Sequence, residues 1–309
     1  MTKKKKQRYR IRNWRDYNKA LIARGSLTLW IDSRAVDKWL SHDSPARRGR
    51  RRTYTDIAIE CSLLLREVYH LPLRSTQGLV RSLLRLLSLN LPAPDYSTLS
   101  RRARLLPLSF STHATKAVAH LVIDSSGLKV FGEGEWKVRV HGADKRRTWR
   151  KLHISMDAET HHITAALLTD KDALDRNSVA ALLKQTEAKI EAVCADGAYD
   201  FEQCYRAIKE REAVALIPPR RDAVIREKSP FEQRDENLRG IRRHGRKGWK
   251  KISGYHQRSL VECAFFRLKT LFTDRLRARR TDTQTAEAVI RCQALNRMTS
   301  LGMPQSLAI

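Results

Sequence analysis

The order of strand-like and helix-like segments after His120 limits the fold of this chain more than any other feature of its sequence. A compact apolar run rich in β-branched residues begins there, and in the two segments that follow apolar residues alternate with the two-residue period of strands, whereas upstream they follow a helical period. The expected elements are strands over 120–132, 151–157 and 161–169, a helix over 178–190, a strand over 190–196, a helix over 201–212 and a strand from 213. A polar turn at 157–160 joins the second strand to the third. This order predicts an α/β domain.

Three helices are predicted upstream of the strands. Two amphipathic segments come first, the second of them after Ser75, and a third, basic helix with Arg101 and Arg102 follows Asp95. Ser75 and Asp95 are expected to cap their helices, because their side chains can accept backbone N–H groups. Two helices, a tight polar break and a basic third helix are compatible with a helix-turn-helix DNA-binding domain over residues 14–110. A helical pack that dimerises or supports a neighbouring domain fits the same pattern.

The chain is strongly basic. It has 61 Lys and Arg residues against 33 Asp and Glu residues, which gives a net charge of +28 over 309 residues. The basic residues form clusters at Lys3–Lys6, Arg47–Arg52, Lys145–Lys151, Arg242–Lys251 and Arg275–Arg280. Several separate clusters predict a surface that follows a long polyanion such as DNA. Residues 1–13 are expected to be a disordered basic arm that adds non-specific affinity.

Other features of the composition exclude some classes of protein. No apolar run is long enough to cross a membrane, and the lysine-rich start lacks the apolar segment of a secretory signal. A cytoplasmic, nucleoid-associated protein is therefore expected. The cysteines are scattered and odd in number, with no CxxC pair, so we expect buried, reduced thiols and neither a zinc site nor a disulfide framework.

A phosphate-handling set of side chains lies at helical spacing in the segment YHQRSLVECAFFRLK, which spans Tyr255–Lys269. A helix would place Arg258, Glu262 and Lys269 on one polar stripe, with Cys263 among the residues of the buried side. One carboxylate among basic side chains suits a metal-assisted phosphodiester site, where the acid holds a cation and the bases bind DNA oxygens. The alternative is a solvated helix face with an ion pair between Arg258 and Glu262.

Two further acids can complete such a site. Asp124 interrupts an apolar strand, where a carboxylate needs a cation, a hydrogen-bond donor or an exposed sheet end. Asp196 stands where a buried strand runs into Gly197, and ligands usually bind at the carboxyl ends of strands in open α/β sheets. Alternatively, Asp196 only starts a turn. If the helix with Glu262 packs beside these strands, three carboxylates can hold two divalent cations that clamp the attacking and leaving oxygens of a phosphodiester.

Together these residues resemble a known family. The strand order, the two acids and the spacing Y-(2)-R-(3)-E-(6)-K, matched by Tyr255, Arg258, Glu262 and Lys269, are similar to bacterial insertion-sequence transposases of the DDE type, most of all the IS-five family. The segments KRRTWRKLHI, before the hairpin, and ADGAYD, around the second acid, also look like that family. The motif around the first acid, Asp124, reads Asp-Ser-Ser where members of that family commonly have Asp-Ser-Thr. This difference leaves the acid in place.

The resemblance implies a fold and a set of roles. The fold is an RNase H-like mixed sheet flanked by helices over residues 115–300, with a basic insertion at 220–254, preceded by the all-α DNA-binding domain. Asp124, Asp196 and Glu262 are implied to bind the catalytic metals, which are two Mg²⁺ ions or Mn²⁺ in their place. The Tyr, Arg and Lys of the signature are implied to handle the transposon end.

The activity implied is transposition. Such an enzyme binds the terminal inverted repeats of an insertion sequence, cleaves at the element ends and joins the 3′-hydroxyl to target DNA. Its partner is double-stranded DNA, and it is expected to act as a homodimer or larger assembly. One alternative is a metal-dependent nuclease that does not join strands, and another is a non-catalytic DNA-binding regulator on a transposase scaffold.

Additional DNA contacts are predicted from the basic segments. Trp249, inside RKGWKK, can stack on a base as a single-strand platform does, or it can anchor its loop to the core. Arg150 and Lys151 are expected beside the catalytic strands, where they would meet the DNA backbone together with Arg101 and Arg102. The histidines, which lack a metal-binding spacing, are assigned no role.

Overall fold

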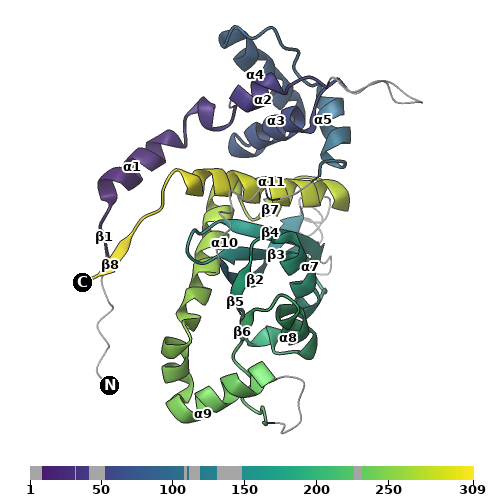
Figure 1. The fold of residues 1–309 in the computed structure, drawn as a ribbon. Coiled ribbons are helices and arrows are strands. Elements are labelled where there is room, and N and C mark those ends of the chain that lie inside the picture. The colour runs from purple at the N-terminus through teal and green to yellow at the C-terminus, as the bar shows by residue number, and fades with distance from the viewer. Residues whose placement is uncertain are drawn as a thin grey trace, which may run out of the picture. The chain divides into compact units, whose positions relative to one another are not determined.

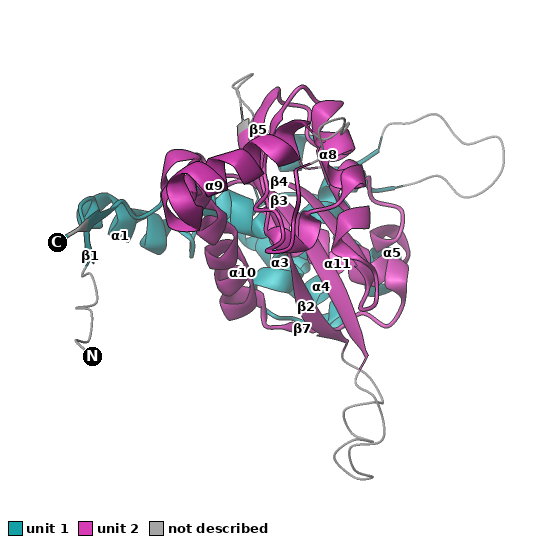
Figure 2. Cartoon of the chain, turned by 90° about the horizontal axis from the view of Figure 1, so that it is seen from below, with its two compact units in different colours: residues 1–99, 294–309 teal, residues 100–293 magenta. Residues whose placement is uncertain are grey.

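The computed structural model describes residues 9–31, 33–41, 53–107, 110, 119–130, 148–225 and 232–309. The basic clusters Lys3–Lys6 and Arg47–Arg52 lie outside these residues. The chain divides into two compact units, which Figure 2 shows in teal and magenta. Unit 1 comprises residues 1–99 and 294–309, and unit 2 comprises residues 100–293. The division thus falls at other positions than the expected domain boundaries, and unit 1 includes the last residues of the chain.

Unit 1 is mostly helical, as the sequence predicts. Its elements are β1 (Tyr9–Ile11), α1 (Trp14–Ala23), η1 (Leu27–Leu29), α2 (Ser33–Asp37), α3 (Asp56–Val68), α4 (Leu73–Leu86), the start of α5 (Tyr96–Ala103), the end of α11 (Thr281–Ser300) and β8 (Ser306–Ala308). Trp30 and Trp39 are fully buried. The Arg297 side chain, on α11, donates to the backbone oxygens of Leu29 and Trp30 at 3.3 and 3.4 Å. This contact binds the end of α11 to the N-terminal helices of unit 1.

Two local expectations for unit 1 need correction. Residues 9–11 belong to no disordered arm, because β1 pairs with β8 in an antiparallel ribbon. Ser75 does not cap a helix, because α4 already begins at Leu73, directly after the extended Pro72. The predicted cap at Asp95 is confirmed: Asp95 Oδ1 accepts from the backbone N–H groups of residues 97 and 98, both at 2.9 Å.

Unit 2 is built on a mixed sheet, as expected from the sequence. The strands are β2 (Ala119–Val130), β3 (Trp149–Asp157), β4 (Ile163–Asp170), β5 (Ile190–Cys194) and β6 (Val214–Leu216), in the order β4-β3-β2-β5-β6, and β7 (Arg275–Leu276) pairs with the end of β2. Strand β3 is antiparallel to both β2 and β4, whereas β5 and β6, each preceded by a helix, run parallel to β2.

The faces of this sheet are covered by different helices (Figure 1). Leu121 and Ile123 of β2 lie in one apolar core with α7 (Val179–Gln185) and α8 (Glu202–Lys209). Because side chains alternate along a strand, Asp124 points to the other face, against which α10 (Ser259–Phe272) packs. The first acid therefore lies between the sheet and α10.

Helices in the middle of unit 2 differ from the sequence-based expectations. The helix predicted to reach residue 190 ends at Gln185, because residue 190 already belongs to β5. Asp200, which precedes the predicted helix at 201, does not cap α8. It accepts instead from the Tyr205 hydroxyl and the Arg234 guanidinium, at 3.0 and 2.9 Å.

The basic segment 220–254 contains a long helix that the sequence analysis does not predict. Helix α9 (Glu232–Ile252) is interrupted at Gly245, where φ is 68°, and leads into the short 3-10 turn η4 (Tyr255–Arg258). Two further 3-10 turns, η2 (Asp175–Asn177) and η3 (Gly197–Tyr199), follow β4 and β5. None of the helices in the described ranges is long and apolar enough to cross a bilayer.

Candidate active site

The predicted acids come from separate elements of unit 2. Asp124 lies within β2, Glu262 lies in the first turn of α10, and Asp196 follows β5 as the N-cap of η3. Strands β2 and β5 are parallel neighbours in which Val122 pairs with Cys194. Asp124 and Asp196 each follow these paired residues by two positions, so their carboxyl groups lie at the same level of the sheet.

Arg258 joins two of the acids. Its Nη1 donates to Asp124 Oδ2 at 3.3 Å, and its Nη2 donates to Glu262 Oε1. The side chains of Asp124 and Arg258 are 20% and 23% exposed, whereas that of Glu262 is 55% exposed. The ion pair of the alternative interpretation exists, but it is not confined to a solvated helix face, because the same guanidinium reaches a carboxylate of the sheet.

The electrostatics of Asp124 depend on all of these groups. Burial is the main cause that raises its pKa, and the negative charges of Asp196 and Glu262 raise it further. The backbone N–H of Ser125, which donates to Asp124 Oδ1 at 2.8 Å, and the charge of Arg258 act in the opposite direction. Oδ1 is therefore held by the backbone, while Oδ2 faces the guanidinium. The ionised carboxylate needs a cation beside it.

The other residues of the signature occupy different environments. Lys269 Nζ donates to Ser126 Oγ at 2.7 Å, and Ser126 lies two positions beyond Asp124 on the same face of β2. Tyr255 is only 7% exposed, and its ring centroid lies 5.5 Å from that of Trp249. Burial raises the pKa of the Tyr255 hydroxyl to about 12. Lys269 thus lies beside the acids, whereas Tyr255 is part of the core where α9 meets η4.

The acids fit a divalent cation in their chemistry. Carboxylate oxygens are the ligands that Mg²⁺ and Mn²⁺ prefer. As the side chains lie, no group of three Asp, Glu, His or Cys residues in the described part of the chain is close enough to hold an ion. The Arg258 guanidinium supplies the positive charge between Asp124 and Glu262 instead. If these acids hold a divalent ion, they would have to lie closer together than they do here, with Arg258 withdrawn from them.

Comparison with known proteins decides the family. Two family models, both described as a transposase DDE domain, match residues 22–133 and 119–297, and the second match covers more than half of the chain. This chain belongs to the DDE transposases. Members of this family cut and join DNA with the help of divalent metal ions. The match over 119–297 includes all of the acids and the whole Y-R-E-K signature.

One solved structure with similarity to the transposase is the cryo-EM structure of the piggyBac transposase synaptic complex with hairpin DNA. The TM-score is 0.43 and the sequence identity is 12%, over 90% of this chain and 73% of that chain.

Two of the predicted DNA contacts of the transposase are buried. Trp249 is 5% exposed and packs so closely on α9 that a Cβ atom at Gly240 would lie 2.8 Å from its Cδ1. A base cannot stack on a buried indole, so Trp249 is an anchor to the core, as the alternative has it. Arg102 is only 9% exposed, which does not fit a contact with DNA, whereas Arg101 is exposed on α5 and stays a predicted contact.

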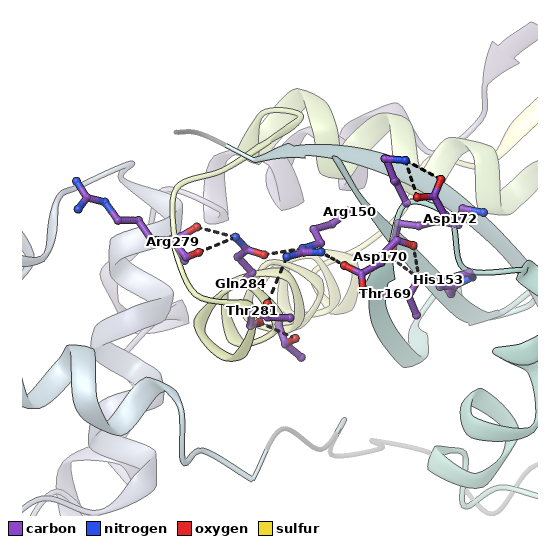
Figure 3. A network of polar contacts seen from close by, with 12 residues as sticks. Arg150, His153, Thr169, Asp170, Asp172, Arg279, Thr281 and Gln284 are labelled. Carbon is purple, nitrogen blue, oxygen red and sulfur yellow. Dashed lines mark hydrogen bonds and ion pairs between the residues drawn. The ribbon is translucent and has the colours of Figure 1, made fainter. Parts of the chain in front are cut away.

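Arg150 and Lys151 lie on β3, but their side chains are bound within the transposase. Arg150 Nε donates to Gln284 Oε1 at 2.9 Å, and its guanidinium also pairs with Asp170, as Figure 3 shows. Lys151 Nζ donates to the Ala173 backbone oxygen at 2.9 Å and pairs with Asp175, which follows β4. Their side chains are only 18% and 23% exposed, so the prediction that they meet the DNA backbone does not fit these contacts.

The roles of the two serines that follow Asp124 are not predicted from the sequence. Ser126 accepts from Lys269, and the Ser125 backbone N–H holds the Asp124 carboxylate. A signal for both was present, because consecutive hydroxyl side chains inside an apolar strand need hydrogen-bond partners. The cysteines are free thiols, and all are buried except Cys263, which is exposed although the helical stripe places it on the buried side.

Proposed function

We propose that this DDE transposase binds the terminal inverted repeats of an insertion sequence of the IS-five type, cleaves DNA at the element ends and joins the freed 3′-hydroxyl to target DNA. The observation that supports this best is the contact of Arg258 with both Asp124 and Glu262. It brings β2 and the signature helix together at one point, although Arg258 and Asp124 are 134 positions apart in the chain.

Asp124, Asp196 and Glu262 are proposed to hold two Mg²⁺ ions, which Mn²⁺ can replace. Bound divalent ions lower the pKa of a water molecule and neutralise the charge that develops on the phosphate, so no separate side-chain base is needed. The observed cap contact of Asp196, whose Oδ1 accepts from the backbone N–H of Ala198 at 2.8 Å, fixes the position of that carboxylate beside the end of β5.

Arg258 and Lys269 are proposed to bind the transposon end. A guanidinium released from the acids can donate two parallel hydrogen bonds to a phosphate. Lys269 offers a single positive charge two positions along β2 from Asp124, through its contact with Ser126. Tyr255 is buried at the start of η4, the turn that ends at Arg258. In this proposal it stabilises that turn and does not touch DNA.

The N-terminal helices are proposed to read the repeats. Helices α3, α4 and α5 would act as the helix-turn-helix, with Arg101 exposed toward the DNA backbone. We infer that at least two copies assemble on a pair of element ends, because each chain has one set of acids and the element has two ends to cut.

A strand-transfer assay tests the proposal. The full chain is incubated with Mg²⁺, DNA that carries the flanking inverted repeats, and a target plasmid. We expect cleavage at the 3′ ends and joined products, both lost in Asp124→Asn, Asp196→Asn and Glu262→Gln, while DNA affinity is largely kept. Cleavage without joined products would identify a nuclease, and DNA binding without cleavage in the wild type would identify a regulator.

A further inference from the structure

The face of β2 opposite α10 carries a second polar cluster, which surrounds Asp175. Ser125 on β2 is paired with His153 on β3, and Lys151 lies two positions before His153, so all of these side chains share that face. Asp175 comes from outside the sheet, at the start of η2. The roles proposed above use none of these side chains.

Asp175 is held by several groups at once. Its Oδ1 accepts from Ser125 Oγ at 2.8 Å and lies 3.2 Å from Lys151 Nζ. Its backbone oxygen accepts from Ser178 Oγ at 2.7 Å, which fixes the turn. The Asp175 side chain is 24% exposed, so it is mostly enclosed between η2 and the sheet.

His153 encloses the carboxylate without neutralising it. The imidazole is fully buried, its Nδ1 lies 3.6 Å from Asp175 Oδ1, and its Nε2 forms a hydrogen bond with Thr169 Oγ1 at 2.9 Å (Figure 3). Burial lowers the pKa of His153 to about 4, so the ring is neutral at physiological pH. The cation that balances Asp175 is therefore Lys151, and this contact accounts for the low exposure of the Lys151 side chain.

Ser125 connects this cluster to the catalytic acid. Its Oγ donates to Asp175 on one face of β2, and its backbone N–H donates to Asp124 Oδ1 at 2.8 Å. Tyr199, 1% exposed, lies close to the same groups: burial raises the pKa of its hydroxyl, and the charges of Asp175, Asp124 and Asp196 raise it further. Asp175 therefore acts in the same electrostatic environment as the two acids of the sheet.

We infer that Asp175 is a positioning residue: by holding Ser125, it fixes the Asp124 carboxylate so that Oδ2 stays available to a cation. This inference rests on the proposed role of Asp124 as a metal ligand. Groups that orient a ligand from behind typically change metal affinity or activity by about 10- to 100-fold when removed. An effect of that size is expected here.

The experiment compares Asp175→Ala, Asp175→Asn and Ser125→Ala with the wild type and with Asp172→Ala. Asp172, labelled in Figure 3, is the matched control, because it lies in the same loop, is 81% exposed and, among the residues that the structure describes, pairs with the neighbouring Lys171 alone. Mn²⁺ affinity is measured by calorimetry on the full chain without DNA, and kcat and KM are measured on DNA with an element end.

We expect Asp175→Ala and Ser125→Ala to weaken Mn²⁺ binding by about 10-fold or more and to lower kcat, with KM for DNA unchanged. Asp175→Asn should stay within about 3-fold of the wild type, because its amide oxygen can still accept from Ser125. Asp172→Ala should match the wild type.

Wild-type Mn²⁺ affinity and kcat in a folded Asp175→Ala or Ser125→Ala variant would overturn the inference. If Asp175→Ala does not fold, Ser125→Ala decides, since it removes one oxygen and leaves the Asp175 pair with Lys151 in place. Equal losses in Asp175→Asn and Asp175→Ala would also overturn it, because charge and not the Ser125 contact would then matter. Failure of the proposed function looks different: the wild type then binds no Mn²⁺, or Asp124→Asn cleaves normally.

Discussion

Replacing Arg258 with Lys separates the two interpretations of the signature helix. The substitution keeps the positive charge but removes the planar fork that reaches Asp124 and Glu262 together. If Arg258 only pairs with these acids, the loss is one of stability. If it also binds the transposon end, the loss extends to cleavage.

The structure sets the size of each effect. The contact with Glu262 is an i, i+4 pair with a half-exposed acid, which contributes about 0.3–0.5 kcal/mol. The contact with Asp124 is more enclosed, and hydrogen bonds to charged groups contribute about 1.5–3 kcal/mol when buried. Because Lys keeps part of the second contact, we expect a loss of about 1 kcal/mol in the free energy of unfolding, or about 2–4 °C in Tm.

The expected effect on cleavage is larger. Replacing two parallel hydrogen bonds to a phosphate by one loses about 1.5–3 kcal/mol of transition-state stabilisation. At 1.36 kcal/mol for each factor of ten, the rate of end cleavage should fall by about 10- to 100-fold. DNA affinity should fall less, because many other basic residues contribute to it.

The assay measures Tm and single-turnover cleavage on the same preparations. The matched control is Arg206→Lys, because Arg206 pairs with Glu202 in the same i, i+4 arrangement on α8, with side chains 67% and 52% exposed. The control should lose less than about 0.5 kcal/mol and cleave at the wild-type rate. A lowered Tm with normal cleavage in Arg258→Lys would refute the proposed contact with DNA.

Three other predictions concern stability. Because the pKa of Asp124 is raised, its contribution to stability is present below the unfolded-state pKa of about 4 and is lost as pH rises through the folded-state pKa. In EDTA, Asp124→Asn should therefore raise Tm at pH 7–8, with a difference that shrinks toward pH 4; a lower Tm than wild type at pH 8 contradicts this. Trp249→Ala should lower the free energy of unfolding, measured by chemical denaturation, by about 3–5 kcal/mol. A Trp249→Phe variant that is stable but binds single-stranded DNA more weakly would instead support the stacking interpretation. Gly240→Ala should lower the free energy of unfolding by about 1–3 kcal/mol, because the added Cβ atom meets Trp249. Gly78→Ala should raise it by about 0.5–1 kcal/mol, because no atom lies within 4 Å of the added Cβ atom. Equal effects of the two substitutions would argue against the packing of Trp249 on Gly240.

Local patterns predict the sheet of unit 2 because each strand carries its own signal. Strands β3 and β4 and the polar turn between them are confirmed, and Asp157 Oδ1 accepts from the backbone N–H groups of residues 159 and 160, which holds the turn. The positions of Asp124 and Asp196 at one level of the sheet follow from the parallel pairing of β2 with β5. The sequence predicts the strands, but that pairing is a property of the assembled sheet.

Helix α9 is not predicted from the sequence, because it is stabilised by contacts with residues far away in the chain. The segment is rich in basic residues and contains glycine at 240, 245 and 248, and this composition favours a loop. Its buried side chains meet partners elsewhere: Asn237 Nδ2 donates to the Ala215 backbone oxygen of β6 at 2.7 Å, and Trp249 packs on Tyr255. The spacing of residues within the segment does not indicate these distant partners.

The signature helix shows a similar limit. A single helix from Tyr255 predicts one stripe, but the left-handed Gly254 and the 3-10 turn η4 come before α10, so the regular helical angle begins only at Ser259. Tyr255 is consequently turned into the core. The contacts of Glu262 and Lys269 could be placed on one face from spacing alone, whereas the second partner of Arg258 could not, because Asp124 is brought there by the sheet.

The pairing of β1 with β8 has a consequence for synthesis of the chain. Residues 9–11 leave the ribosome before unit 2 and residues 306–308 only after it, so the ribbon cannot close until translation has passed both strands. Domains generally fold as units while synthesis proceeds, which lets unit 2 assemble its acids around β2 first. A product that stops between residues 294 and 305 would carry the complete acid set of unit 2 but would lack β8. Translation thus gives the transposase an order of maturation, with the acids in place before unit 1 is complete.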